Sequence, residues 1–360
     1  MKKSARNNEP NRKVLDNGCD NAYDNAYCLP ASGGTWLFAK EGHMNARTHK
    51  TGLVYDPAYK KHLTGSGHPE RPERCDAVIQ ALRAAGFADA LRDVPARPAT
   101  EQQVLACHSK QYLELVKSDV ASGASTLTTG DTEICADSLE VALLAAGGVL
   151  AAVDAVMAGT VRNAFCMVRP PGHHATVERG MGFCVFNNVA IAARYCQQKH
   201  GLDRALIVDW DIHHGNGTQD IFYDDNTVFY FSTHMWPFYP GTGSRSERGL
   251  RKGEGYTLNC PFPAGAGGKE IIGAFRDELL PRAETFKPDF VLISAGFDSR
   301  EGDPLGYFRL TDEDFAELTR LMMQIADTHA GGRLVSVIEG GYSLSGIAAA
   351  STAHVGALAG

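Results

Sequence analysis

The chain of 360 residues lacks three features that would each assign it to a particular class of proteins. It has no excess of positive charge: 35 Lys and Arg against 42 Asp and Glu give a formal net charge of −7, whereas a large nucleic-acid-binding face is basic. No run approaches the roughly 20 apolar residues of a membrane span. Residues 1–13 are basic but lack the apolar core of a signal peptide. We therefore expect no direct nucleic-acid partner and no membrane association.

Paired cysteines are lacking as well. Nine cysteines are scattered along the chain, and none forms a C-x-x-C motif. An odd number without regular spacing is typical of reduced thiols, most of them buried, and predicts a cytoplasmic location. Cys19, Cys28 and His43 match no zinc-ligand spacing. What the chain does contain, 44% hydrophobic and 21% charged residues, is the ordinary composition of a globular protein.

Residues 1–51 differ from the rest of the chain. They are rich in Asn, Asp, Gly and Lys and contain the short echo NAYDNAY at 21–27. Their weak hydrophobic periodicity predicts an N-terminal extension that is poorly ordered or accessory. From residue 52 onward, short apolar runs alternate with amphipathic segments, and no linker interrupts them. We therefore expect one domain over residues 52–360.

The apolar runs of this domain predict buried strands at 53–56, 163–168, 204–211, 227–234, 289–296 and 333–340. Helical periodicity marks 70–86, 101–118, 138–159, 187–200, 268–286 and 311–330. Thr311, followed by three acidic residues, is typical of a helix cap. This alternation predicts an α/β fold with a central, mostly parallel sheet and helices on both faces. Ligands of such sheets bind beyond the carboxyl ends of the strands, where we expect the active site.

Glycine-rich loops with polar side chains follow five of the predicted strands. They include RPPGHHA (169–175), DWDIHHGNG (209–217), STHMWPFYPGTG (232–243), AGFDSREGDP (295–304) and EGGY (339–342). One polar loop at a strand end is ordinary. Five loops with His, Asp or Tyr at the same edge of a sheet are hard to explain by solvation alone. The pattern predicts a catalytic site.

The loop at 209–217 predicts a metal site. Alternate side chains of an extended segment point the same way, so Asp209, Asp211 and His213 share one side. A carboxylate and an imidazole two residues apart can both reach one metal ion. Asp298, in the loop after another strand, adds a second carboxylate. Three protein ligands with a fourth position left for water describe a catalytic zinc site.

Two adjacent histidines suit proton transfer beside such a metal. Pro170, Pro171 and Gly172 force a sharp turn that presents His173 and His174 side by side. Oriented by a second group each, they would provide an acid and a base. Asp209 and Asn216 are the orienting groups that we expect. Tyr342 follows two glycines at a strand end, where a phenol could stabilise an oxyanion.

These residues together resemble the histone deacetylase family, zinc-dependent amidohydrolases with an arginase-like α/β fold. The resemblance covers about residues 52–360 and is carried by motifs in the order and spacing of the family: GHPERPER (67–74), RPPGHHA (169–175), GFCVFNN (182–188), DWDIHHGNG (209–217), FYPGTG (238–243), SAGFDSREGDPLG (294–306) and EGGYSL (339–344). HPERPER, HHGNG and GFDS look like the class II branch and its bacterial relatives. Class I enzymes carry Asp where Asn216 stands.

The resemblance implies a role for each matching position. Asp211, His213 and Asp298 bind zinc. His173 and His174 form the catalytic pair, supported by Asp209 and Asn216 respectively, and Tyr342 polarises the substrate carbonyl. Substrate-binding positions are Gly182, Phe183, Tyr239 and Leu305. The family usually has Phe where Tyr239 stands, which puts the polarity of the channel and its acyl preference in question. A structural potassium site corresponds to Asp209, Asp211, His213, Ser232 and Thr233, and a second monovalent site to Phe222, Asp225 and Val228.

The expected reaction is hydrolysis of an acyl-amide, most simply an Nε-acetyl-lysine in a peptide or protein. An acetylpolyamine amidohydrolase is the first alternative, although Leu305 in DPLG offers no charge to a cationic substrate. A ureohydrolase of the arginase type needs two manganese ions and more carboxylates. A non-catalytic acyl-lysine-binding protein would be expected to lose Tyr342 or a zinc ligand. The sequence leaves open a homo-oligomer.

Overall fold

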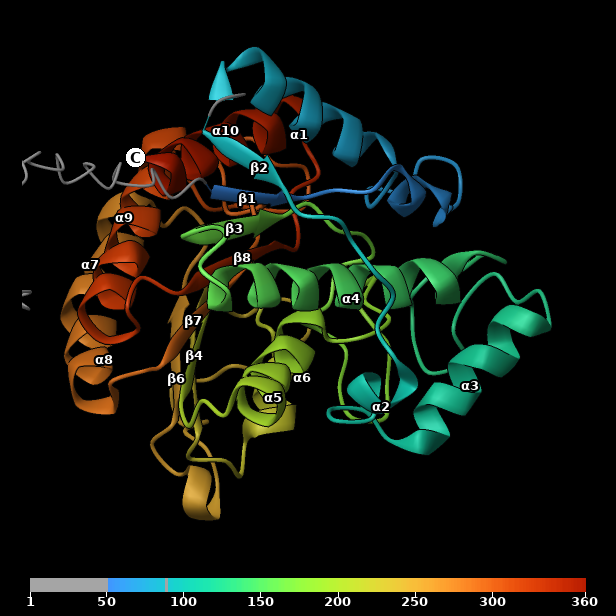
Figure 1. Ribbon diagram of the computed structural model, residues 1–360, viewed down its shortest axis with the longest axis horizontal. Helices are drawn as coiled ribbons and strands as arrows, with labels where there is room; N and C mark the ends of the chain where they lie inside the picture. The colour runs from blue at the N-terminus through green and yellow to red at the C-terminus, as the bar shows by residue number, and fades with distance from the viewer. Residues whose placement is uncertain (1–50, 88–89) are drawn as a thin grey trace, which may run out of the picture. The chain divides into compact units, whose positions relative to one another are not determined.

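Eight parallel strands form the centre of the computed structural model, which describes residues 51–87 and 90–360 (Figure 1). The strand order in the sheet is β2-β1-β3-β8-β7-β4-β5-β6, and every neighbouring pair is parallel. The strands are β1 (Thr51–Val54), β2 (Leu91–Asp93), β3 (Asn163–Cys166), β4 (Ala205–Asp209), β5 (Val228–Met235), β6 (Thr257–Phe262), β7 (Phe290–Ala295) and β8 (Leu334–Ile338). Five of the six interior strands, β3, β4, β5, β7 and β8, are buried along their whole length, as expected for a parallel sheet covered on both faces.

Helices cover both faces of this sheet. Figure 1 shows α4, α5 and α6 on one side and α7, α8 and α9 on the other. The helices are α1 (Glu73–Ala84), α2 (Glu101–Val104), α3 (Lys110–Ala121), α4 (Ser138–Met157), α5 (Asn188–His200), α6 (Asn216–Phe222), α7 (Gly268–Ala274), α8 (Leu280–Phe286), α9 (Asp312–His329) and α10 (Leu344–Ala359). Short 3-10 turns lie at Pro57–Lys61 and Arg251–Gly253. The predicted fold class is therefore confirmed.

The helix termini follow from local hydrogen bonding. Thr311 Oγ1 accepts from the Asp314 N–H at 3.3 Å, and the Asp314 carboxylate accepts from the Thr311 N–H at 2.7 Å, which caps α9 as predicted. The helix predicted at 101–118 is in fact two helices, because the Ser109 side chain caps a new start at α3. The segment predicted as one helix at 268–286 is interrupted by a π-helical turn at Phe275–Leu279.

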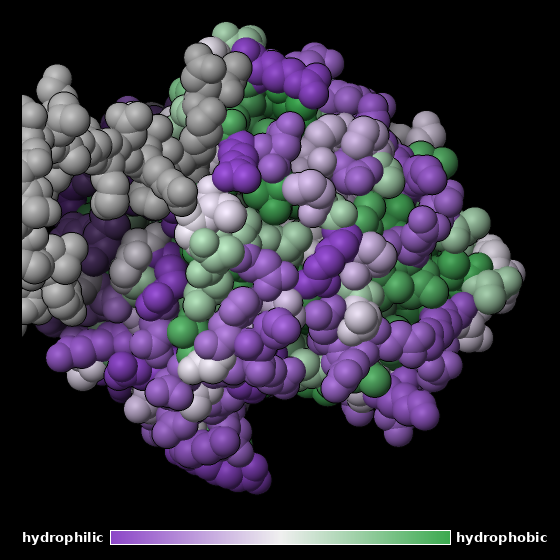
Figure 2. All heavy atoms as spheres, in the orientation of Figure 1, coloured by the Kyte–Doolittle hydropathy of each residue, from purple (hydrophilic) through white to green (hydrophobic). Residues whose placement is uncertain are grey.

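One helix corrects the expectation that no segment is long and apolar enough for a membrane. By length and composition α4, with 20 residues, qualifies. However, 61% of its most apolar window is buried, and it packs against β1, β3, β8 and α5. Its apolar character is therefore explained by its place over the sheet. The face of the molecule drawn in Figure 2 is mostly hydrophilic, with hydrophobic residues in small groups.

The extension predicted at 1–51 lies outside the described residues, except for Thr51, which begins β1. The same holds for Cys19, Cys28 and His43. In the described ranges seven cysteines are free, and all but Cys135 are buried. This is the state that was expected for reduced thiols.

Candidate active site

The six interior strands place their carboxyl ends at one edge of the sheet, because they are all parallel. The loops after β3, β4, β5, β7 and β8 begin there. They contain the predicted catalytic and zinc-binding residues except Asp209, which ends β4, and Asn216, which begins α6. Main-chain hydrogen bonds join these loops to one another. The Gly340 N–H donates to Asp211 at 2.8 Å, and the Ile212 N–H donates to Asp298 at 2.9 Å. The edge therefore forms one connected site.

Asp211, His213 and Asp298 converge on one point. A potential ligand atom from each lies within 4.8 Å of the others, and all three residues are buried. His213 Nδ1 lies 3.0 Å from Asp211 Oδ1 and 3.1 Å from Asp298 Oδ2. Burial, together with repulsion from Asp211, raises the pKa of Asp298 to about 7. Two buried carboxylates this close are costly unless a cation lies between them.

The donor set therefore fits a divalent metal ion. One imidazole and two carboxylates are ligands that zinc accepts, and three protein ligands leave a position for water or substrate. Burial lowers the pKa of His213, but hydrogen bonds to Asp211 and Asp298 outweigh it and raise that pKa to about 10. A bound metal ion would replace the His213 imidazolium as the cation beside the two carboxylates. His213 would then lose its proton, and the neutral imidazole could bind the metal ion as well.

The two adjacent histidines differ in their surroundings. Their rings lie 4.0 Å apart, and each Nδ1 has one partner: Asp209 for His173 at 3.0 Å, and Asn216 for His174 at 2.8 Å. Burial alone would lower the pKa of His173, but the charges of Asp209 and Asp211 raise it to about 10. Burial, together with repulsion from His173 and His213, holds the pKa of His174 well below its usual value.

This asymmetry assigns different protonation states to the pair. His173 favours the imidazolium, whereas His174 favours the neutral ring that can accept a proton. His174 also lines the cavity in front of the metal-type cluster, and His173 does not. The structure thus brings both histidines together with the two orienting residues expected from the sequence.

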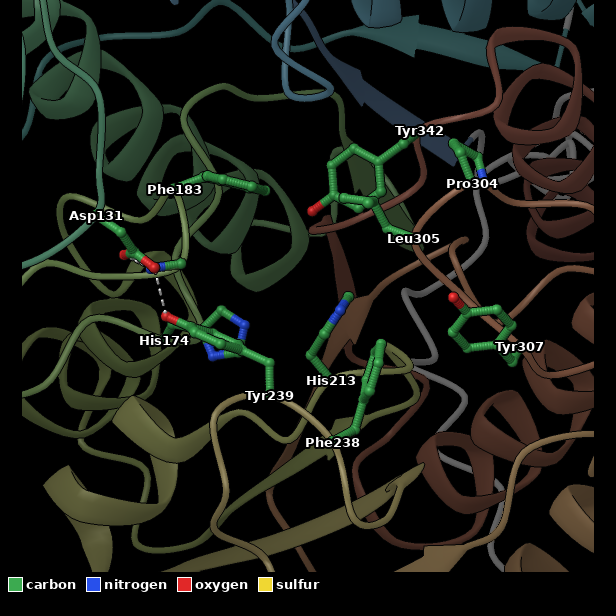
Figure 3. Close-up of a pocket in the computed structure, with 11 residues that line it drawn as sticks. Asp131, His174, Phe183, His213, Phe238, Tyr239, Pro304, Leu305, Tyr307 and Tyr342 are labelled. Atoms are coloured by element: carbon green, nitrogen blue, oxygen red, sulfur yellow. Dashed lines mark hydrogen bonds between the residues drawn. The ribbon is translucent and has the colours of Figure 1, made fainter.

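Tyr342 lies at the same cavity with 8% of its surface exposed. Its N–H donates to Asp303 Oδ2 at 2.7 Å, and its ring meets the Phe183 ring edge-on with centroids 6.0 Å apart. Gly341, before it, has a φ of +122°, a conformation that favours glycine. The phenol points into the cavity (Figure 3).

A buried arginine fixes this loop from beneath. Arg74 Nε donates to the Gly341 carbonyl at 2.7 Å, another of its nitrogens donates to the Glu339 carbonyl, and its guanidinium lies 5.2 Å from the centre of the Tyr342 ring. Glu70 binds both Arg74 and Arg169, so the HPERPER motif is tied to the loop that carries Tyr342. The motif itself was recognisable in the sequence, but its role depends on contacts across more than 260 residues.

The cavity is a narrow channel of about 210 Å³. Figure 3 shows its side chains arranged around an open centre, with His174, His213 and Tyr342 among them. All four predicted substrate-binding residues line it, together with residues that the sequence did not single out: Asp131, Phe238, Pro304 and Tyr307. Asp131 was missed because it lies between two helices and not at a strand end.

The residues of the two expected monovalent sites are placed differently. Asp209 and Ser232 are direct neighbours in register on β4 and β5, and Thr233, which follows Ser232, is buried. These three residues of the expected potassium site therefore lie close together. At the second site, the Asp225 carboxylate binds Arg194 at 2.7 Å and Thr227. The Arg194 guanidinium also lies 4.7 Å from the centre of the Phe222 ring. A positive charge of the protein itself thus lies next to that site.

A buried cluster of one His and two Asp below a narrow aromatic channel, at the strand ends of an α/β sheet, is typical of a metal-dependent hydrolase. The model of the histone deacetylase domain matches residues 68–358. The chain therefore belongs to the histone deacetylase family, whose members are deacetylases, hydrolases that act on amide bonds. The predicted family is confirmed.

Relatives in several organisms support this membership. A probable deacetylase of Archaeoglobus fulgidus is 42% identical over 298 residues, which are 82% of each chain. The human polyamine deacetylase HDAC10 is 43% identical over 291 residues, 78% of this chain and 43% of that protein. The crystal structure of the HDA15 HD domain superposes with a TM-score of 0.82 at 39% identity, covering 86% of this chain and 90% of that one. The chain thus spans less than half the length of human HDAC10.

Proposed function

We propose that this chain is a zinc-dependent amidohydrolase that removes acetyl or other acyl groups from the Nε of lysine in peptides or proteins. The observation that carries the proposal is the convergence of His174, Tyr342 and His213 on one narrow cavity. These residues are a proton acceptor, a hydrogen-bond donor and part of a metal-type cluster. Their combination is what water-dependent cleavage of an amide requires.

Each side chain has a defined task in this reaction. Phe183 and Tyr239 grip the aliphatic stem, so that the amide arrives beside Tyr342 and His174. Zinc bound by Asp211, His213 and Asp298 would polarise the amide carbonyl and lower the pKa of the attacking water. His174, neutral at the start, accepts the proton of that water. The Tyr342 hydroxyl donates to the carbonyl oxygen as it gains negative charge.

The leaving amine then needs a proton. His174, after accepting one, lies on the cavity wall and can donate it to the nitrogen. Asn216 holds His174 in place, and the Asp209–His173 pair places a positive charge behind it. Acetate and a free amine result. We further propose potassium at the Asp209–Ser232 site and a cytoplasmic location, which the seven free cysteines support.

A second candidate is hydrolysis of acetylpolyamines. The observation that favours it is the Asp131 carboxylate at the cavity, which a cationic substrate would meet. Leu305, on the cavity wall, has no charge and favours the peptide substrate. Both candidates use the same catalytic residues.

The test compares an acetyl-lysine peptide, acetylspermidine and acetylputrescine as substrates of the wild type and of Tyr342→Phe. Loss of one oxyanion donor lowers kcat by about 100-fold to 1,000-fold. We expect fast peptide turnover that collapses in the variant, with the zinc content unchanged. Preference for the acetylpolyamines would favour the second candidate. A zinc-loaded wild type that cleaves none of the three would contradict both and favour a binding role.

A further inference from the structure

One carboxylate at the cavity joins both aromatic walls of the channel. Asp131, on the loop between α3 and α4, accepts from the Gly182 N–H with Oδ1 at 2.7 Å. Its Oδ2 accepts from the Tyr239 hydroxyl at 3.2 Å, the contact drawn as a dashed line in Figure 3. Gly182 directly precedes Phe183, so one side chain holds the backbone of one wall and the ring of the other.

The wall formed by Gly182 and Phe183 needs such support, because its backbone conformation is unusual. Gly182 and Phe183 have φ values of +57° and +68°, the second uncommon for a residue with a side chain. The Tyr239 ring meets the His174 ring edge-on, with centroids 5.2 Å apart. A phenylalanine at position 239 would preserve this packing and leave Asp131 Oδ2 without its donor. The main effect of the Tyr239 hydroxyl is therefore its hydrogen bond to the Asp131 carboxylate, and not a change in the shape of the channel.

Charge at the channel is unevenly distributed. Among the lining residues of the described chain, Asp131 supplies the one carboxylate, and the side formed by Phe238, Pro304, Leu305 and Tyr307 has no charge. A cationic group that enters the channel therefore finds a single attractive partner. The hydroxyl of Tyr239 already occupies one oxygen of that partner.

We propose that the Asp131–Tyr239 pair determines substrate specificity, because the hydroxyl masks the carboxylate from cationic stems and so favours acyl-lysine within a peptide over acylated diamines and polyamines. This inference rests on the proposed amidohydrolase function. An ammonium group gains more from an unmasked carboxylate than a neutral amide N–H does, since charge-assisted hydrogen bonds are about twice as strong. Removing the hydroxyl should therefore improve cationic substrates selectively.

Two small substrates isolate this effect. N-acetylcadaverine and N-pentylacetamide have the same five-carbon stem, and only the first has an ammonium, at the position of the main-chain nitrogen of acetyl-lysine. The measured quantity is the ratio of their kcat/KM values. We expect Tyr239→Phe to raise the ratio of the cationic to the neutral compound about threefold, within the range for a partly exposed charged pair. Tyr307→Phe removes a hydroxyl at the same cavity without touching Asp131, and its ratio should equal that of the wild type.

Asp131→Asn provides the second arm. The amide keeps an oxygen for the Gly182 N–H and a polar partner for Tyr239, but it removes the charge. In this background Tyr239→Phe should leave the ratio unchanged, because the two substitutions act on one interaction. Two results would overturn the proposal. One is a kcat/KM ratio that Tyr239→Phe alone does not change, and the other is an equal increase of that ratio when Tyr239→Phe is made in the Asp131→Asn background.

A binding measurement separates this proposal from the proposed function. The dissociation constants of both compounds are measured by calorimetry in the Tyr342→Phe background, with and without Tyr239→Phe. If the wild type cleaves neither compound, the proposed amidohydrolase function fails, but a selective gain in affinity for N-acetylcadaverine still supports the masking pair. If the wild type cleaves both compounds, and Tyr239→Phe changes neither the ratio of their kcat/KM values nor the ratio of their dissociation constants, only the proposed masking of Asp131 by Tyr239 is wrong.

Discussion

Two groups of metal-ligand-type side chains lie beneath the same edge of the sheet. The first is Asp211, His213 and Asp298, and the second, which we call the loop cluster, is His173, Cys184 and Glu339. Both are buried, and in both the candidate ligand atoms lie within 4.8 Å of one another. Distance and residue type alone would therefore predict two metal sites in the described part of the chain.

The charge of the candidate ligands distinguishes the two groups. In the loop cluster, Glu339 already accepts three hydrogen bonds, from the Gly172 N–H, the His173 N–H and the Ser294 hydroxyl. Burial raises the pKa of the Cys184 thiol well above its usual value, which favours the protonated form. In the first group, two carboxylates face each other beside an imidazole that reaches the cavity. Asp211 and Asp298 also accept backbone N–H groups, from Gly340, His213 and Ile212, so the number of hydrogen bonds does not separate the two groups. What separates them is charge, because only the first group places two carboxylates beside one imidazole.

The largest expected effect comes from Asp298→Asn. The substitution keeps the shape of the side chain and removes one of the two facing negative charges. We expect loss of bound zinc and a fall in deacetylation of about a thousandfold or more, since metal catalysis supplies several kcal/mol. Metal analysis and peptide turnover measure both. Asp289→Asn, before the same strand β7, is the control and should keep zinc and activity. Full activity of Asp298→Asn would contradict the assignment of the metal site to the first group and not to the loop cluster.

Glu339→Ala tests the loop cluster as a support of the histidine loop. It leaves two backbone N–H groups and one hydroxyl without an acceptor, so we expect a loss of about 3 kcal/mol in the free energy of unfolding. Glu339→Gln keeps an oxygen for the N–H groups and an amide that can donate to Ser294, and it should cost about 1 kcal/mol. Denaturant unfolding measures both values. Zinc loss in the Gln variant would show that Glu339 is a metal ligand instead.

The smallest effect is expected for Cys184→Ala. A buried, protonated thiol contributes mainly packing, and its removal should cost about 1 kcal/mol of stability. Zinc content should not change, and activity should stay within about threefold of the wild type, with the small cavity as the only perturbation. A variant that loses zinc would place a second metal in the loop cluster.

Much of the fold could be predicted from the sequence, because the sequences of buried parallel strands are continuous runs of apolar residues. All six predicted strands exist, with bounds that differ by a few residues. The edge strands β2 and β6 were missed for physical reasons. β2 has three residues, none of them buried, and β6 is only partly buried and contains Pro261. Without burial on both faces, an edge strand has no continuous apolar signal.

Residues of the candidate site could be predicted where the signal is the residue type at a strand end, and could not where the signal lies in contacts. Asp211, His213, Asp298 and Tyr342 belong to the first kind. Glu339 stands in a motif that the sequence made conspicuous, yet its support of the histidine loop becomes visible only once β8 lies beside β3. Asp131 has no local signal, because its partners are 51 and 108 residues away.

The most direct test of the account is a zinc titration of the metal-free protein, with deacetylation of an acetyl-lysine peptide as the readout. We expect activity to rise linearly and to level off at one zinc per chain, and Glu339→Gln to show the same end point. An end point at two equivalents in the wild type that falls to one in Glu339→Gln would contradict this expectation. That result would mean that the loop cluster also binds a metal ion needed for catalysis.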